Sequence, residues 1–248
     1  MKCILLAAGY ATRLYPLTEN FPKPLLKVGG RGGVPEKTIL DWLMDDIGGE
    51  ADEFVVISNH RFAPHFEAWA AEHPLPVTVV DDGTSTNETR LGAVRDIQFA
   101  AKKLGIRDDC LVLAGDNVLD FSLRSFIRFA REKGTSCTMR YRENDESRLR
   151  RSGVAEIDGD RLVSLEEKPA EPKSHWCTPP FYYYTAADLA RIPEAIADGC
   201  GTDAPGSLVA WMCRHSEMHS MEMPGRRYDI GSLESYRLVQ ETYRGIVR

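Results

Sequence analysis

The sequence lacks the features of a disulfide-rich, zinc-binding or membrane-spanning protein. Its six cysteines are scattered without a CxxC pair, and its six histidines show no HExxH spacing, so neither a disulfide framework nor a zinc site is expected. No apolar run reaches the length of a membrane span, and the stretch Cys3–Ala8 is too short for a signal peptide. A net charge of -6 argues against a nucleic-acid-binding surface. We therefore expect a cytoplasmic protein with reduced thiols and with neither nucleic acid nor membrane as a partner.

Two familiar phosphate-binding loops are absent as well. A dinucleotide-binding GxGxxG loop requires small residues where this chain has Ala11 and Leu14, and the leucine would crowd the contact between helix and strand. A Walker A loop requires glycine before Lys-Ser/Thr, whereas Glu36 precedes Lys37 and Thr38. Any phosphate site in this chain must be built differently.

The first half of the chain alternates between strand and helix patterns. With 248 residues and 43% hydrophobic residues, one large α/β domain is the expectation. This alternation predicts a Rossmann-like fold with a mixed, mostly parallel sheet and helices on both faces. The expected strands are Cys3–Ala7, Phe54–Ile57, Pro76–Val80 and Cys110–Leu113, and the expected helices are Pro64–Glu72, Arg90–Leu104 and Ser122–Lys133.

The second half breaks this rhythm and predicts a small β-rich lobe. Thr135–Arg142 is typical of a strand, and Gly153–Ile157 with Arg161–Leu165 predicts a hairpin. The charged stretch Arg140–Arg151 is interpreted as a mobile surface loop. We expect a single domain over residues 1–248, with halves at about 1–134 and 135–231 and a final helix at 232–248.

The first strand leads into a loop that combines small residues with permanent positive charge. Ala8-Gly9-Tyr10-Ala11 lets backbone N–H groups approach a phosphate or a base closely. Arg13 follows, and Lys23 stands between two prolines. The two cations suit a polyphosphate, so both are candidate catalytic residues. The alternative, a buried strand with an ordinary polar loop, does not need this combination.

Two aspartates are candidate ligands for Mg²⁺, a cation that is commonly held by one or two carboxylates together with phosphate oxygens and water. Asp116 follows the strand Cys110–Leu113, and ligands in open parallel sheets bind beyond the carboxyl ends of strands. Asp229 precedes the expected last helix. Each aspartate could instead cap a helix. For the last helix Ser232 fits the cap position better, which leaves Asp229 available for metal.

These segments resemble those of the sugar-phosphate nucleotidylyltransferases, such as the glucose-1-phosphate thymidylyl- and uridylyltransferases. The opening, LLAAGYATRLYPLTENFPKPLL, is similar to the family signature LAAGxGTRLxPxTxxxPKPL, and Glu167-Lys168-Pro169 is similar to the family's EKP segment. The resemblance covers nearly the whole chain, in the short form without a C-terminal β-helix. It implies Mg²⁺-dependent transfer of a nucleotidyl group from an NTP to a sugar 1-phosphate, with release of pyrophosphate.

The resemblance also implies roles for individual residues. Residues 1–134 become the nucleotide-binding half and 135–231 the acceptor-binding half. Asn87 and Gly92 are candidates for base or sugar contacts, with an ordinary surface loop capped by Thr86 or Thr89 as the alternative; Gly92 within a helical pattern costs about 1 kcal/mol, which close approach of a ligand would justify. The implied sets are Arg13 and Lys23 for catalysis, Leu6, Ala7, Ala8, Gly9, Thr12, Asn87 and Gly92 for nucleotide, Glu167, Lys168 and Tyr183 for acceptor, and Asp116 and Asp229 for Mg²⁺.

Two departures from the family pattern leave the acceptor open. Ala11 stands where the signature has glycine, and Thr178–Tyr184 replaces the family's Asn-Thr-Gly-Ile/Val-Tyr segment, whose Asn and Gly touch the sugar. One alternative is a cytidylyltransferase acting on a non-sugar phosphate or phosphonate such as phosphocholine. Another is a non-catalytic regulator that binds nucleotide sugars. The oligomeric state also stays open, with a homodimer among the options.

Overall fold

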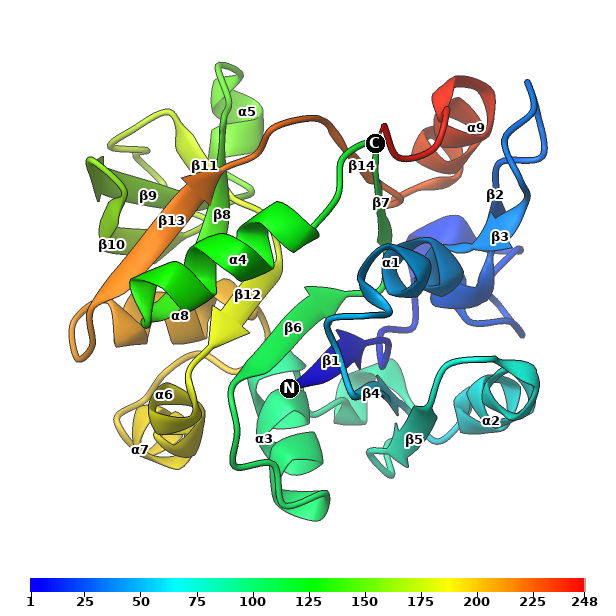
Figure 1. Cartoon of the computed structure of the whole chain (residues 1–248), viewed down its shortest axis with the longest axis horizontal. Coiled ribbons are helices and arrows are strands. Elements are labelled where there is room, and N and C mark those ends of the chain that lie inside the picture. Colours follow the sequence, from blue (N-terminus) through cyan, green and yellow to red (C-terminus); the bar gives the residue numbers. More distant parts are fainter. Residues whose placement is uncertain (248) are drawn as a thin grey trace. The chain divides into compact units, whose positions relative to one another are not determined.

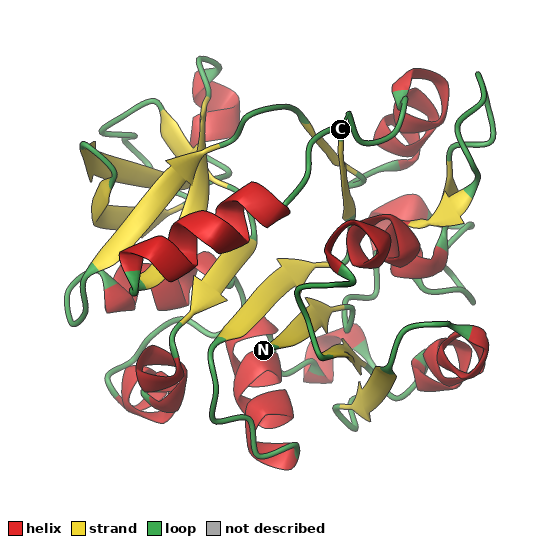
Figure 2. Cartoon of the chain, in the orientation of Figure 1, coloured by secondary structure: helices red, strands yellow, loops and turns green. Residues whose placement is uncertain are grey.

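A computed structural model describes residues 1–247 of the chain and shows a mixed α/β fold, as expected (Figures 1 and 2). Contacts within the chain divide it into two compact units. Unit 1 consists of Met1–Lys2, Leu91–Leu113 and Ser125–Met223. Unit 2 consists of Cys3–Arg90, Ala114–Arg124 and Pro224–Arg248. Each unit is described in turn.

Unit 2 is built on a short sheet in the order β1-β4-β5, formed by Lys2–Leu6, Glu53–Ser58 and Val77–Asp81. β4 is an apolar run of which all but the first residue are buried, and it pairs in parallel with β5. Helix α2 (Ala63–Glu72) connects these two strands, as parallel pairing requires. This βαβ arrangement is what the alternating sequence pattern predicts.

Short antiparallel ribbons and two helices complete unit 2. β2 (Lys27–Val28) pairs with β3 (Lys37–Thr38), and β7 (Asn117–Leu119) pairs with β14 (Arg227–Asp229). Helices α1 (Ile39–Ile47) and α9 (Leu233–Thr242) begin with capping boxes. A buried cluster lies beneath these ribbons and joins segments far apart in the sequence: Leu14, Leu26, Val28, Ile39, Trp42, Val118, Ile230, Val239 and Tyr243.

Unit 1 contains the longer run of strands, in the order β11-β9-β10-β13-β8-β12-β6 with an additional pairing of β11 to β8. The five strands from β11 to β8 therefore form a closed ring of hydrogen-bonded neighbours, which leaves no free edge among them. Within unit 1, β13 and β8 pair in parallel and β12 pairs antiparallel with both β6 and β8. The strands are β6 Cys110–Ala114, β8 Ser136–Arg142, β9 Gly153–Asp158, β10 Arg161–Glu167, β11 Trp176–Thr178, β12 Phe181–Tyr184 and β13 Met218–Glu222.

Helices lie on both faces of the strands of unit 1. In Figure 1, α4 (Arg124–Lys133) crosses in front of β8 and β12, whereas α8 (Gly206–Met212) is partly hidden by α4 and contacts β10. α4 turns Phe126, Ile127 and Ala130 into the core. The remaining helices are α3 Ala93–Lys103, α5 Glu146–Leu149, α6 Ala186–Ala190 and α7 Ile192–Ala197.

The hairpin is confirmed, because β9 and β10 pair antiparallel, but several expected boundaries are wrong. The helix predicted from Arg90 begins at Ala93, since Gly92 has a φ of +86° that no helix contains. The charged stretch predicted as a loop continues β8 to Arg142 and includes α5. The helix predicted from Ser232 to Arg248 ends at Thr242; Tyr243 is extended instead, and its hydroxyl donates to Leu119 O at 2.8 Å. Arg248 lies outside the described residues.

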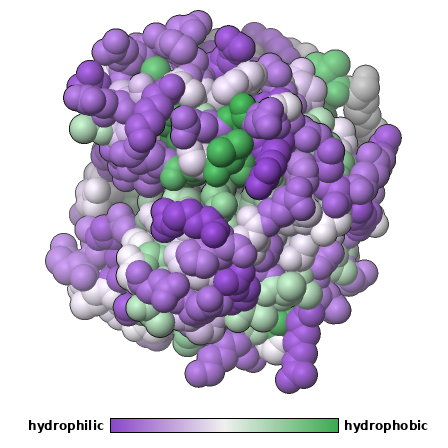
Figure 3. All heavy atoms as spheres, turned by 90° about the vertical axis from the view of Figure 1, so that its left-hand side faces the viewer, coloured by the Kyte–Doolittle hydropathy of each residue, from purple (hydrophilic) through white to green (hydrophobic). Residues whose placement is uncertain are grey.

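The surface and the thiols agree with the composition. The face shown in Figure 3 is hydrophilic over most of its area, with apolar side chains gathered near its upper centre and scattered elsewhere. Among residues 1–247, no helix combines the length and apolar character needed to cross a bilayer. All six cysteines are free thiols, and Cys3, Cys110, Cys137 and Cys177 are buried.

Ala11 adopts the left-handed backbone conformation, with a φ of +49°. Its carbonyl accepts hydrogen bonds from Leu14 N at 2.9 Å and Thr18 Oγ1 at 2.8 Å, so the neighbouring turn depends on this conformation. A non-glycine residue in this region costs roughly 1–2 kcal/mol. The chain therefore keeps a glycine-like turn at the position where the family signature has glycine.

We predict that Ala11→Gly raises the free energy of unfolding by about 0.5–1 kcal/mol, because relief of this strain exceeds the added chain entropy of glycine. Chemical denaturation measures the change. The matched control is Ala68→Gly in the exposed part of α2, which should lower the free energy of unfolding by about 1 kcal/mol. A loss of stability in both variants would contradict the strain at Ala11.

Candidate active site

Arg13 is presented by a turn whose next residue is anchored in the core. Thr12–Leu14 form a single 3-10 turn, in which Leu14 is 1% exposed and belongs to the buried cluster of unit 2. Thr12 and Arg13 are exposed on the opposite side of the turn. The guanidinium is near enough to Asp229 to act on its pKa. The turn thus places the permanently charged Arg13 near Asp229.

Lys23 is held on a second 3-10 turn, Lys23–Leu25, between Pro22 and the buried Pro24. Its ammonium donates to Asp116 Oδ2 at 2.8 Å and to Ile230 O at 3.1 Å. Only 14% of the side chain is exposed. The prolines fix the backbone of this turn, which lowers the entropic cost of directing a long side chain to one place.

Asp116 follows β6 after a glycine that is needed for close packing. Gly115 N donates to Leu6 O at 3.0 Å, and a Cβ on this residue would lie 3.1 Å from that oxygen. Asp116 Oδ1 accepts a hydrogen bond from Asn117 Nδ2 at 2.5 Å. Its two carboxylate oxygens are thereby directed by an amide and an ammonium. It caps no helix, because α4 begins only at Arg124.

Asp229 is brought to Asp116 by the β7–β14 ribbon. Asp229 pairs with Asn117, and Ile230 N donates to Asp116 O at 3.0 Å. Arg227, two residues earlier on the same face of β14, donates to Asn117 Oδ1 at 2.7 Å and has its Nη1 3.6 Å from Asp229 Oδ1. Ser232 caps α9, as the sequence predicts, so Asp229 is not used as a cap.

The pKa values of the two carboxyl groups are shifted in opposite directions. Burial alone would raise the pKa of Asp116, but the Lys23 ammonium, through its charge and hydrogen bond, holds it below its usual range. The pKa of Asp229 is raised by loss of solvent and by the negative charge of Asp116, although Arg227, Lys23 and Arg13 partly oppose this. Repulsion between the carboxylates is therefore only partly offset by protein cations.

This donor set suits a divalent cation that completes its coordination with phosphate and water. Within residues 1–247 no group of three or more potential His, Cys, Asp or Glu ligands occurs, so a closed protein site such as structural zinc requires is not formed there. Two carboxylates that repel each other beside the cationic side chains of Arg13, Lys23 and Arg227 fit Mg²⁺, which is typically held by one or two carboxylates plus substrate phosphates.

The loop after β1 is fixed at its ends and open at its centre. Ala7 N donates to Ile57 O at 2.9 Å, and Ala8 O accepts from Asn59 Nδ2 at 2.9 Å. The Tyr10 hydroxyl reaches Thr84 O at 3.2 Å. Gly9 between them is exposed, and no atom lies within 4 Å of where its Cβ would be. Backbone at Gly9 is thus accessible to a ligand, and Asn59 and Tyr10 hold it in place.

Asn87 and Gly92 belong to different units. Asn87 is exposed and opens a 3-10 turn in unit 2, and its carbonyl accepts from Arg90 Nη1 at 2.9 Å. Gly92 is buried in unit 1, where a Cβ would lie 2.5 Å from Thr202 O. Positive φ and this backbone contact, rather than a ligand, account for glycine at position 92.

The acceptor candidates Glu167 and Lys168 lie at the end of β10. Lys168 has a φ of +52°, unusual for a non-glycine residue, and its N–H donates to Ser152 O at 2.9 Å. Glu167 pairs with Gly153 across the hairpin. Among the described residues its carboxylate has no hydrogen-bonding partner, and burial raises its pKa. The partly buried Glu167 carboxylate, which can accept hydrogen bonds, is thus adjacent in the chain to the exposed Lys168.

Tyr183, the third acceptor candidate, has another role. The residue is 3% exposed, and its hydroxyl donates to Asp109 Oδ2 at 2.7 Å. Burial and the Asp109 carboxylate raise its pKa well above the ordinary value. Asp109 also accepts from Ala186 N at 2.8 Å, so this contact joins β12 to the start of β6 and to α6. The geometry gives the prediction of an acceptor contact no support.

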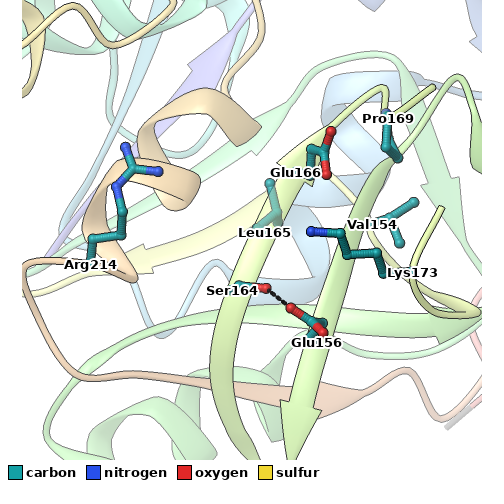
Figure 4. A pocket seen from close by; sticks show the side chains of 8 residues that line it. All are labelled: Val154, Glu156, Ser164, Leu165, Glu166, Pro169, Lys173 and Arg214. Atoms are coloured by element: carbon teal, nitrogen blue, oxygen red, sulfur yellow. Dashed lines mark hydrogen bonds between the residues drawn. The ribbon is translucent and has the colours of Figure 1, made fainter. Parts of the chain in front are cut away.

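A pocket of about 340 Å³ lies beside the hairpin (Figure 4). Glu166 lines it, whereas Glu167 is not among its lining residues. Ser164 donates to Glu156 Oε2 at 2.6 Å inside it. The full lining is Val154, Glu156, Ser164, Leu165, Glu166, Pro169, Lys173 and Arg214. The Glu167 carboxylate is therefore not part of this pocket's lining.

The chain belongs to the nucleotidyl transferase family, whose model matches residues 2–245. It is 33% identical to a glucose-1-phosphate thymidylyltransferase of Mycolicibacterium smegmatis over 80% of this chain and 67% of that protein. It is 28% identical to the UTP–glucose-1-phosphate uridylyltransferase AglF of Haloferax volcanii over 98% of both chains. It spans 50% of a Sulfolobus acidocaldarius relative named for mannose-1-phosphate guanyltransferase activity, at 28% identity over 77% of this chain.

Solved structures share the fold. A UDP-glucose pyrophosphorylase in complex with UDP-glucose matches 98% of this chain and 97% of its own with a TM-score of 0.81 at 16% identity. The same comparison with an apo UDP-glucose pyrophosphorylase gives a TM-score of 0.80 at 15% identity. The Rossmann-like α/β fold expected from the sequence is confirmed.

We predict opposite effects of neutralising the two aspartates on stability at pH 7. Asp229→Asn should raise the free energy of unfolding by about 0.5 kcal/mol, because it removes like-charge repulsion at a partly exposed site. Asp116→Asn should lower it by about 1–3 kcal/mol, because Lys23 loses its charged partner. Denaturation at several pH values measures both.

The pH dependence of the free energy of unfolding tests whether each carboxylate stabilises or destabilises the protein. The stabilising contribution of Asp116, whose pKa is lowered, is present above its unfolded pKa and lost as the pH falls through its folded pKa. The gain in Asp229→Asn should shrink as the pH falls below the raised pKa of Asp229, because the wild-type carboxyl is then already neutral. Equal losses in both variants would contradict this assignment.

Proposed function

We propose that the protein transfers a nucleotidyl group from an NTP to a sugar 1-phosphate, releasing pyrophosphate and forming an NDP-sugar. The observation that carries the proposal is the Lys23–Asp116–Asp229 cluster beside Arg13, in which Arg13 and Lys23 come from the segment that resembles the family signature. Membership of the nucleotidyl transferase family and the named activities of the Mycolicibacterium and Haloferax relatives support the same reaction class.

The protein's task is to bring anions together and to stabilise the charge that moves. A non-bridging oxygen of the acceptor phosphate attacks the α-phosphorus of the NTP. The bond from that phosphorus to the oxygen it shares with the β-phosphorus then breaks, and pyrophosphate leaves. The attacking oxygen is already ionised, so no protein base is needed. Positioning and electrostatic stabilisation then supply the catalysis.

Each cation has a separate part in this proposal. Arg13 binds the phosphates that leave as pyrophosphate, and Lys23 stabilises the negative charge that develops at the α-phosphate. Backbone of Leu6 to Gly9, with Thr12 and Asn87, forms the binding surface for the nucleotide. Asp116 and Asp229 would hold Mg²⁺, which when bound offsets phosphate charge.

Acceptor binding is assigned to Glu167 and Lys168. The Glu167 carboxylate, without a hydrogen-bonding partner among the described residues, is an acceptor for hydroxyl groups of a sugar, and the Lys168 ammonium pairs with the acceptor phosphate. A cytidylyltransferase for a non-sugar phosphate stays the second candidate, because Thr178–Tyr184 lacks the Asn and Gly of the family's sugar segment. We further propose a cytoplasmic location, which the free thiols favour.

The test is pyrophosphate release with Mg²⁺, using dTTP, UTP, CTP, ATP and GTP against hexose 1-phosphates, phosphocholine and 2-aminoethylphosphonate. Turnover with a hexose 1-phosphate supports the proposal. Turnover only with CTP and a non-sugar acceptor establishes the second candidate. No turnover together with calorimetric binding of a nucleotide sugar would indicate the non-catalytic regulator.

With the substrates that this assay identifies, Lys23→Ala should lower turnover at least about a hundredfold, the loss expected when a charge stabilising the transition state is removed. The matched control is Lys27→Ala, whose side chain is 64% exposed and lies 3.6 Å from Glu36. The control should keep near-normal turnover. A folded Lys23→Ala enzyme with wild-type turnover would overturn the role of this lysine.

A further inference from the structure

The Glu167 carboxylate lies in a space bordered by two glycines of unit 1. A Cβ on Gly206, the first residue of α8, would overlap Glu167 Oε2 and lie 3.2 Å from its Cδ. A Cβ on Gly153 would lie 3.1 Å from the same oxygen and 2.9 Å from Thr178 Oγ1. The carboxylate thus occupies the places that two side chains would otherwise fill.

Backbone conformation does not require glycine at position 206. Gly206 is absent from the residues with positive φ among those described and is the first residue of α8, so an alanine can adopt the same backbone conformation. The residue is buried, and the atoms that a side chain would meet first are those of Glu167. Space for the carboxylate is therefore the physical reason for glycine here.

We propose that Gly206 is a positioning residue, which by having no side chain leaves the Glu167 carboxylate in the place where it receives the hydroxyl groups of the acceptor. The inference deepens the proposed function and rests on it for the acceptor. Because the crowded atoms are at the end of a flexible side chain, a methyl group at position 206 would displace the carboxylate and leave the surrounding backbone in place.

Gly206→Ala should raise the KM for the acceptor about tenfold or more, since hydrogen bonds to a charged group are lost. The KM for the NTP should stay within about twofold, as its proposed residues lie elsewhere. Gly49→Ala is the matched control, because no atom lies within 4 Å of its Cβ position and its φ is not positive. An unchanged KM for the acceptor in Gly206→Ala would overturn the proposal.

A shorter acid provides a rescue that a merely structural role would not give. Glu167→Asp withdraws the carboxylate by one methylene, which makes room for the methyl group. In Gly206→Ala/Glu167→Asp, both the KM for the acceptor and the unfolding free energy should therefore be better than the sum of the single effects. Strictly additive effects in both measurements would contradict the proposed displacement.

The stability cycle separates the two possible failures. If the wild-type protein turns over no sugar phosphate, the proposed function fails, yet coupling between positions 206 and 167 in denaturation still decides whether Gly206 sets the place of the carboxylate. If Gly206→Ala alone is too unstable to purify, recovery of a folded protein in the double variant supports the proposal, and failure of both variants to fold contradicts it.

Discussion

The fold of unit 2 has to hold one unfavourable interaction in place, the repulsion between the carboxylates of Asp116 and Asp229. The β7–β14 ribbon brings Asp229 beside Asn117, the neighbour of Asp116, and Lys23 offsets part of the repulsion. The hydrophobic cluster beneath supports this arrangement, because Leu14, Val118 and Ile230 are sequence neighbours of residues in the site. Burial of apolar side chains therefore maintains an electrostatic arrangement that would be unfavourable by itself.

Lys23 provides the link between this resting arrangement and the proposed reaction. Its ammonium donates to Asp116 and to the carbonyl of Ile230, so it occupies the position of a counter-ion. A divalent cation at the carboxylates would compete with this ion pair and make the lysine available to a phosphate. The same side chain would then serve the stability of the ligand-free protein and the binding of substrate.

The sequence predicts which residues carry the chemistry of the site better than it predicts the contacts that hold them in place. Arg13, Lys23, Asp116 and Asp229 stand in segments with strong local signals, and the structure places them in one cluster. Arg227 was missed, although the alternation Arg-Tyr-Asp in a strand puts Arg227 and Asp229 on one face. The Gly206–Glu167 relation has no local signal, because it joins helix α8 to β10.

The errors in the predicted helix boundaries also arise from long-range contacts that the local sequence does not indicate. The apolar periodicity predicts a helix that begins before Ala93, because periodicity carries no information on the positive φ of Gly92. The close Thr202 carbonyl, which leaves no room for a Cβ, also requires glycine there. The last helix stops at Thr242 because Tyr243 is used in a long-range contact with Leu119 O and packs edge-on against Trp42. The place of Tyr183 in the sequence predicts an acceptor contact, and its hydroxyl donates to Asp109 Oδ2, a partner that the sequence does not indicate.

The measurement that tests the central claim most directly is a titration with Mn²⁺, a cation with ligand preferences similar to those of Mg²⁺, followed by electron paramagnetic resonance. The wild-type protein should bind Mn²⁺, Lys23→Ala should bind it more tightly because the competing ammonium is gone, and folded Asp116→Asn/Asp229→Asn should lose the binding. Equal Mn²⁺ binding by the wild-type protein and the double variant would contradict the account.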